Sequence, residues 1–226
     1  FPEEGVLQTD VLVTNSLSAA QAQRLQCRLL HVPGAGAEQV ACAALRPGTV
    51  VCNVHGHEVP IAEFTLHAIL EHHLQLWRYP ARLDAEAWAQ VYAQRPAHNE
   101  ACGQTVAVLG FGHIGQEIAR RARALGMHVV AVTRRGVAVD TALAQETVAV
   151  ADLEAVLPRV HVLVVCCPLD DSTRGLLGAR QLALLPPDAL LVNVARAEVV
   201  DEQALYEALR SGRLGRAVLD VWYRYP

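Results

Sequence analysis

Short apolar runs alternate with helical patterns along most of the chain, most regularly after residue 103. Runs rich in Val, Leu and Ala are typical of strands buried in a parallel sheet, and they lie at residues 105–109, 128–133, 161–166, 190–194 and 217–221. Apolar residues at helical spacing between these runs predict helices at 114–125, 152–157, 179–185 and 202–211. This alternation predicts an α/β domain with a doubly wound parallel sheet.

The first 58 residues show a smaller version of the same alternation. Apolar runs predict strands at 10–13, 27–32 and 49–53, and helical patterns lie between them at 19–25 and 37–45. The expected product is a small βαβ domain of flavodoxin-like type. Residues 61–77 then form a helical pattern with a broad apolar stripe, and a polar linking segment follows. We therefore expect two domains, residues 1–58 and residues 59–226.

Composition supports the α/β class and excludes some kinds of partner. The chain is 52% hydrophobic but only 5% aromatic, and its formal net charge of −4 argues against a nucleic-acid partner. Six cysteines without a Cys-x-x-Cys pair favour reduced thiols in a cytoplasmic protein. No apolar stretch is long enough to cross a membrane. The ten histidines have no recognisable ligand spacing, so we expect no metal site.

A glycine-rich turn joins the strand at 105–109 to the helix after it. Gly110, Gly112 and Gly115 form a G-x-G-x-x-G motif between a predicted strand and a predicted helix, the setting in which this motif indicates a Rossmann dinucleotide site. Gly110 permits the tight turn, Gly112 lets the backbone approach a pyrophosphate, and Gly115 lets the helix pack closely. Backbone N–H groups near His113 and Ile114 would hold the phosphates. The alternative is a turn that only packs tightly.

Two arginines stand where an NAD site usually has an acid. The second strand of the motif ends Thr133-Arg134-Arg135, and no carboxylate follows before Asp140. An acid at this position binds the ribose hydroxyls of NAD, whereas arginine can bind a 2′-phosphate through two hydrogen bonds. The sequence thus predicts NADP(H) in preference to NAD(H), with Arg134 as the first contact and Arg135 as the second. The alternative, that one or both point into solvent, is more credible for Arg135.

Several blocks together resemble the D-isomer-specific 2-hydroxyacid dehydrogenases over almost the whole chain. They are LLHVPGAG, IAEFTLHAIL, the glycine turn, PLDDSTRG, LVNVARAEVVD and GRAVLDV. The resemblance implies reversible hydride transfer between a nicotinamide and C2 of a small 2-keto or 2-hydroxy acid. It also implies a homodimer, for which the helix at 61–77 is either a contact or simply part of the core. The rival hypothesis is a dinucleotide-binding regulatory or scaffold protein on the same fold, without turnover.

The resemblance also assigns roles to residues around the nicotinamide. Arg196, in VNVAR, matches the catalytic arginine, whose guanidinium can bind the substrate carboxylate and polarise the keto oxygen. Asp220 matches the aspartate that holds the nicotinamide carboxamide. Backbone or wall positions around the cofactor are matched by Cys167, Pro168, Val194 and Ala195.

On the substrate side, Ala35 and Gly36 match the loop whose backbone N–H groups bind the substrate carboxylate. His57 stands where many members carry a substrate-side asparagine. A histidine there could bind a carboxylate or act as a surrogate acid, and it could equally be a hinge residue without chemistry.

The resemblance departs at Tyr225, where a glutamate that pairs with the acid/base histidine is expected. The same glutamate is missing from the formate dehydrogenase branch, which has a similar Asp-Val-Trp segment. The histidine itself is expected beyond Pro226, and the first strand and helix of the family are expected before Phe1. Both domains are thus expected to be incomplete at the chain ends.

Overall fold

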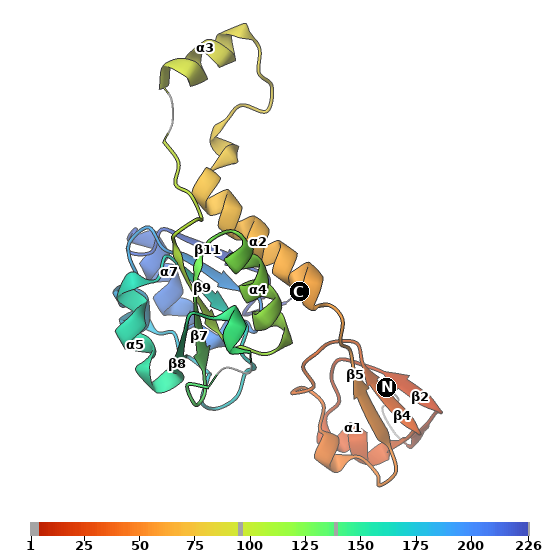
Figure 1. The fold of residues 1–226 in the computed structure, drawn as a ribbon. Coiled ribbons are helices and arrows are strands. Elements are labelled where there is room, and N and C mark those ends of the chain that lie inside the picture. The colour runs from red at the N-terminus through yellow and green to blue at the C-terminus, as the bar shows by residue number, and fades with distance from the viewer. Residues whose placement is uncertain (1–4, 95–96, 138–139, 226) are drawn as a thin grey trace. The chain divides into compact units, whose positions relative to one another are not determined.

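The computed structural model describes residues 5–94, 97–137 and 140–225 (Figure 1). The chain divides into two compact units, Phe1–His57 and Glu58–Pro226. The functional roles of the two predicted domains stay predictions at this point, and each unit is described by itself.

In the described part of the larger unit, six parallel strands form one sheet in the order β11-β10-β9-β6-β7-β8. The strands are β6 (Thr105–Leu109), β7 (His128–Thr133), β8 (Glu146–Ala149), β9 (Val162–Val165), β10 (Leu190–Asn193) and β11 (Arg216–Leu219). Strands β7 and β8 follow β6 on one side of it. The chain then returns to the other side of β6, where β9, β10 and β11 follow in that order. This confirms the doubly wound parallel sheet. The strand missed by the sequence pattern, β8, is a half-buried edge strand.

Helices cover both faces of this sheet (Figure 1). On one face lie α2 (Glu58–Leu74) and α4 (His113–Ala124), which pack against each other. On the other face lie α5 (Leu153–Val156), α6 (Ala179–Leu184) and α7 (Glu202–Arg210). Successive side chains of a strand point to opposite faces, so the two buried clusters share the strands but not their side chains. The four central strands, β10, β9, β6 and β7, are therefore buried on both faces, which explains their continuous apolar runs.

The segment after α2 contains a helix that the sequence pattern did not predict. Residues 85–94 form α3 (Ala85–Gln94), whose first turn is held by the Asp84 carboxylate accepting from Ala87 N at 2.9 Å. All of α3 lies in the described part of the chain, and none of its side chains is buried.

The larger unit also contains short 3₁₀ turns in its connecting segments. They are η2 (Leu76–Arg78), η3 (Thr141–Leu143), η4 (Val150–Asp152), η5 (Leu157–Arg159) and η6 (Ala197–Val199).

The described part of the smaller unit has a parallel three-stranded sheet in the order β2-β4-β5 and a short parallel pair, β1 with β3. These strands are β1 (Leu7–Gln8), β2 (Val11–Val13), β3 (Leu25–Gln26), β4 (Leu29–Val32) and β5 (Val50–Asn53). Its helix α1 (Ala19–Arg24) begins with a capping box, in which Ser18 and Gln21 accept from each other's backbone N–H. The three strands and the first of the two helices predicted here are confirmed.

The helix predicted at residues 37–45 is wrong. The structure has only the 3₁₀ turn η1 (Cys42–Ala44) in this region. Leu17 N donates to the Gln39 carbonyl at 2.9 Å, and Ala41 N donates to the Leu17 carbonyl at 2.9 Å. Val40 is paired with Leu17 in a parallel bridge and is buried in the core of the unit. The Gln39 carbonyl and the Ala41 N–H, which would form hydrogen bonds within a helix, are instead bonded to Leu17.

Candidate functional site

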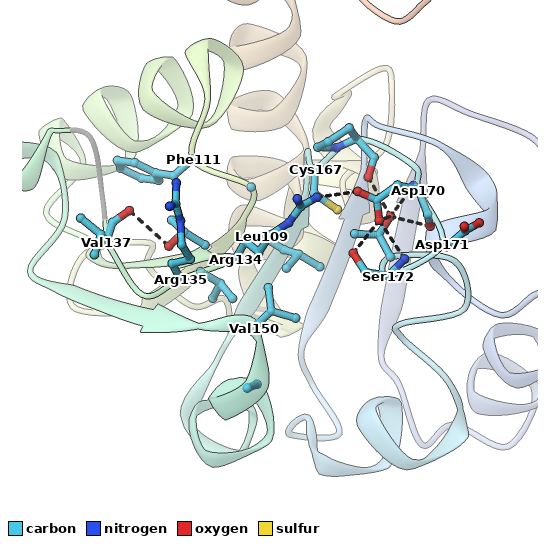
Figure 2. A pocket seen from close by; sticks show the side chains of 16 residues that line it. Leu109, Phe111, Arg134, Arg135, Val137, Val150, Cys167, Asp170, Asp171 and Ser172 are labelled. Carbon is cyan, nitrogen blue, oxygen red and sulfur yellow. Dashed lines mark hydrogen bonds and ion pairs between the residues drawn. The ribbon is translucent and has the colours of Figure 1, made fainter. Parts of the chain in front are cut away.

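A cavity of about 1280 Å³ lies at the carboxyl ends of β6, β7 and β9 (Figure 2). Strand order reverses between β6 and β9, and ligands of open α/β sheets bind at such a switch point. Six of the predicted cofactor residues line this cavity: Gly110, Thr133, Arg134, Arg135, Cys167 and Pro168. The cavity is large enough for a drug-sized or cofactor-sized ligand.

The three glycines of the turn are required for different reasons. Gly110 has a φ of +97°, and a Cβ there would lie 2.6 Å from the backbone N and Cα of Cys167. At Gly115 a Cβ would overlap the Gly110 carbonyl oxygen. At Gly112, in contrast, no described atom lies within 4 Å of an added Cβ. Packing in the fold therefore requires glycine at positions 110 and 115. Gly112 is exposed, and no packing contact requires a glycine there.

Helix α4 begins at His113, directly after Gly112, which has no side chain to cap the helix. The N–H groups of a helix's first turn have no partner within the helix, and the helix dipole makes this end positive. The first turn contains His113 and Ile114, the positions at which the sequence predicts phosphate contacts. An anion placed beside the turn would meet these donors.

Both predicted arginines line the cavity, and Arg134 carries an ion pair that the sequence analysis missed. Arg134 Nη2 lies 2.6 Å from Oδ2 of Asp170, a residue of the loop that follows β9, and both residues line the cavity (Figure 2). Asp170 also accepts from Ser172, whose side-chain and backbone hydrogen bonds hold the pKa of the carboxyl below its ordinary value, with Arg134 adding to this. No local signal links the two residues, because they are 36 positions apart.

A second group of predicted residues surrounds the ends of β10 and β11. Asn193 is buried, donates from Nδ2 to the Arg196 carbonyl at 2.9 Å, and accepts from Ala195 N at 3.0 Å. The guanidinium of Arg196 donates to the Ala195 carbonyl at 2.9 Å. Asp220 follows β11 and its N–H donates to the Asn193 carbonyl at 3.0 Å. The strand pairing thus brings the backbones around Val194, Ala195, Arg196 and Asp220 together.

Asn193 is the second residue that the sequence analysis missed. A polar residue that is 1% exposed at the end of a buried strand needs partners, and both polar atoms of its amide are satisfied by the loop that carries Arg196. The available signal was an asparagine in an otherwise apolar run, three positions before the motif arginine.

Burial keeps the two cysteines before Pro168 in the thiol form. Burial raises the pKa of Cys167 to about 11, and it raises the pKa of Cys166 further above its ordinary value. Cys166 Sγ lies 2.9 Å from the Gly110 carbonyl oxygen. Both side chains therefore act as uncharged packing groups, and that of Cys167 lines the cavity.

The predicted substrate residues belong to the smaller unit. Ala35 and Gly36 lie in the loop after β4, and Asn53 Nδ2 donates to the Ala35 carbonyl at 2.9 Å, which ties this loop to the end of β5. His57 is half-buried at the last position of the unit. The substrate-binding roles of these residues stay predictions.

Tyr225 uses its hydroxyl locally. Its oxygen accepts from Trp222 N at 3.2 Å, and the side chain is 68% exposed.

In the described ranges, no three His, Cys, Asp or Glu side chains gather as metal ligands would. Among the same residues, no helix has both the length and the apolar character of a membrane span.

Comparison with known proteins gives a consistent set of relatives. The family model described as the NAD binding domain of D-isomer specific 2-hydroxyacid dehydrogenases matches residues 66–226. A D-3-phosphoglycerate dehydrogenase of Methanocaldococcus jannaschii is 29% identical over 231 residues, which cover 99% of this chain and 43% of the relative. A hydroxypyruvate reductase of Thermotoga maritima is 29% identical over 225 residues, covering 97% of this chain and 71% of the relative.

A solved structure gives the same picture. It is the NADPH-dependent glyoxylate/hydroxypyruvate reductase of Sinorhizobium meliloti in complex with NADP and sulfate. It superposes with a TM-score of 0.75 at 25% sequence identity, covering 99% of this chain and 71% of that one. The chain thus spans less than half of the first relative and about 70% of the other two.

Proposed function

Because the chain belongs to the D-isomer-specific 2-hydroxyacid dehydrogenase family, we propose that the whole protein transfers a hydride between NADP(H) and C2 of a small 2-keto or 2-hydroxy acid. The observation that carries the NADP(H) part is the lining of the cavity, where Arg134 and Arg135 stand beside the glycine turn. The relatives named as glyoxylate or hydroxypyruvate reductases support small keto acids as the substrate class.

The residues present fit a dinucleotide. The open edge at Gly112 and the first turn of α4 would hold the pyrophosphate, and Arg134 and Arg135 would hold a 2′-phosphate. On the other side of the turn, the nicotinamide end would meet Cys167, Pro168, Val194, Ala195 and Asp220. The bound cofactor supplies or accepts the hydride.

Arg196 is the residue that we assign to the chemistry. Its guanidinium carries donors in a planar fork, which matches a carboxylate and also the oxygen that becomes negative as the keto group is reduced. Asn193 fixes the backbone from which Arg196 projects. Ala35 and Gly36 would bind the substrate carboxylate through the backbone, and we assign His57 to the same substrate side, where it would bind the carboxylate or act as a surrogate acid.

The assay that tests this function uses the full-length protein with NADPH and glyoxylate, hydroxypyruvate or phenylpyruvate. We expect NADPH oxidation that depends on the keto acid. Dinucleotide binding without turnover of any of these acids would instead favour a regulatory or scaffold protein on the same fold.

Arg134→Ala is expected to weaken NADPH binding about 10- to 100-fold, because a charge-assisted contact to the 2′-phosphate is lost. NADH binding should change little, since NADH has no such phosphate. Titration of each variant with both cofactors measures this difference. Arg120→Ala is the matched control, because it removes the same charge from a residue on α4 that pairs with Glu117 outside the cavity. Equal wild-type affinities for NADPH and NADH would contradict the NADP preference.

We also propose that the protein is a homodimer, with residues 76–92 in the contact. The apolar side of α2 packs against α4 in the core. Five large apolar side chains after α2 are each more than half exposed: Leu76, Trp77, Leu83, Trp88 and Tyr92. Trp88 and Tyr92 also contact each other through their rings, and several large apolar side chains exposed in one short segment are typical of an interaction surface.

Trp88→Glu is expected to convert the dimer to a monomer, because it places a charge among these exposed apolar side chains. Light scattering of the full-length protein gives the mass. The matched control is Tyr206→Glu, which changes an equally exposed aromatic residue on α7. A dimer that survives Trp88→Glu, or a monomeric wild type, would refute this contact.

We further propose a cytoplasmic location. All six cysteines lie in the described residues and are free thiols, as is usual in a reducing compartment.

A further inference from the structure

The cavity contains a carboxylate beside Arg134, although the strand that carries Arg134 ends without one. Asp170 comes from the loop after β9, and its Oδ2 lies 2.6 Å from Arg134 Nη2. Both residues line the cavity (Figure 2). An NAD site normally has its acid at the end of the second strand, which here is β7. The tertiary structure thus brings to this site, from another strand, the acidic group that the end of β7 lacks.

The loop holds the Asp170 carboxylate in a defined orientation. Oδ1 accepts from Ser172 N at 2.8 Å and from Ser172 Oγ at 2.5 Å. Asp170 N donates to Thr173 Oγ1 at 2.8 Å, and that hydroxyl donates to the Pro168 carbonyl at 2.8 Å. The second carboxylate oxygen, Oδ2, is the one directed at Arg134. The same Ser172 hydrogen bonds lower the pKa of Asp170, so the group is ionised at neutral pH.

We propose that Asp170 is a specificity-determining residue of the cofactor site, accepting the ribose hydroxyls of NAD(H) and competing with a 2′-phosphate for Arg134. This inference rests on the proposed function, because it takes the cavity to bind the adenosine half of the cofactor. A ribose hydroxyl is a donor that a carboxylate attracts. A 2′-phosphate is an anion that the carboxylate repels, and it must take the guanidinium away from Asp170.

Asp170 and Arg134 together therefore allow the site to use both cofactors. The arginine favours NADPH, and the aspartate supports NADH while reducing the advantage of NADPH. The ion pair is accessible, since the Arg134 side chain is 74% exposed and that of Asp170 is 37% exposed. Exchange of the Arg134 partner is thus sterically and energetically easy.

Titration of the full-length protein with NADPH and NADH, on wild type and Asp170→Asn, tests the proposal. Asparagine keeps an oxygen that can accept from Ser172, so the loop should remain folded, and thermal unfolding checks this. We expect NADPH to bind about five- to tenfold more tightly in Asp170→Asn and NADH about tenfold more weakly. In an Arg134→Ala background, the gain in NADPH affinity should shrink, because no guanidinium remains to be released.

Asp171→Asn is the matched control, since Asp171 is the next residue, is exposed and lines the same cavity. It should shift the two dissociation constants much less, and by similar factors. If Asp170→Asn leaves the NADPH/NADH ratio unchanged while wild type binds both, the role of Asp170 is refuted and the proposed function stands. If wild type binds neither dinucleotide, the proposed function fails and this inference fails with it.

Discussion

Arg196→Lys in the full-length protein is expected to lower kcat for keto-acid reduction about 10²- to 10³-fold, with NADPH binding close to wild type. Lysine keeps the positive charge but replaces a planar fork of donors by a single ammonium group, so it cannot hold a carboxylate and the developing oxyanion in the same geometry. Steady-state kinetics with NADPH and hydroxypyruvate measure the change. The loop itself should persist, because Asn193 holds it through the backbone of residues 195 and 196 and not through the guanidinium.

Two further variants separate chemistry from structure at this position. Arg196→Ala should regain part of its activity when guanidinium is added to the assay, which a purely structural role would not allow. Arg180→Lys changes an exposed arginine that pairs with Glu154, and it should leave kcat unaltered. A normal kcat in Arg196→Lys would remove Arg196 from the proposed chemistry.

The second large effect is expected at Gly110. Gly110→Ala should lower the free energy of unfolding by about 2–5 kcal/mol, the sum of a left-handed backbone position and an overpacked contact. The backbone at Gly110 has a φ of +97°, and the new Cβ would lie 2.6 Å from the Cys167 backbone. Neither Gly110 nor Cys167 can move easily, because they follow β6 and β9, which are adjacent central strands of the sheet. Urea unfolding of the two proteins measures the difference.

Gly112→Ala is the matched comparison within the same turn. No described atom lies within 4 Å of its added Cβ and its φ is −78°, so stability should stay within about 1 kcal/mol of wild type. NADPH binding should nevertheless weaken at least about tenfold, because the methyl group occupies the surface that the pyrophosphate approaches. Wild-type affinity in Gly112→Ala would show that the phosphates do not lie against this turn.

Most of the fold could be predicted from local pattern. Five of the six strands described in the larger unit are predicted from the sequence, because a strand buried on both faces must be continuously apolar. The helices that flank them are predicted from apolar residues at helical spacing. The edge strand β8 was missed because it is only half-buried and its run, Glu-Thr-Val-Ala, is not continuously apolar. Residues 37–45 were mistaken for a helix because their backbone pairing with Leu17 leaves no local signal.

In the candidate site too, the features with a local sequence signal could be predicted, and those that depend on distant residues could not. The glycine turn, the two arginines after β7 and the motif around Arg196 can be identified from the sequence alone, because each depends on residues within a few positions of one another. The contact of Asp170 with Arg134 and the hydrogen bonds by which Asn193 holds the loop of Arg196 become visible only in the folded chain. The physical reason is that parallel strands align their carboxyl ends at one edge of the sheet. Charges far apart in the chain are thereby brought within hydrogen-bonding distance, and this depends on strand order, which local residue patterns do not encode.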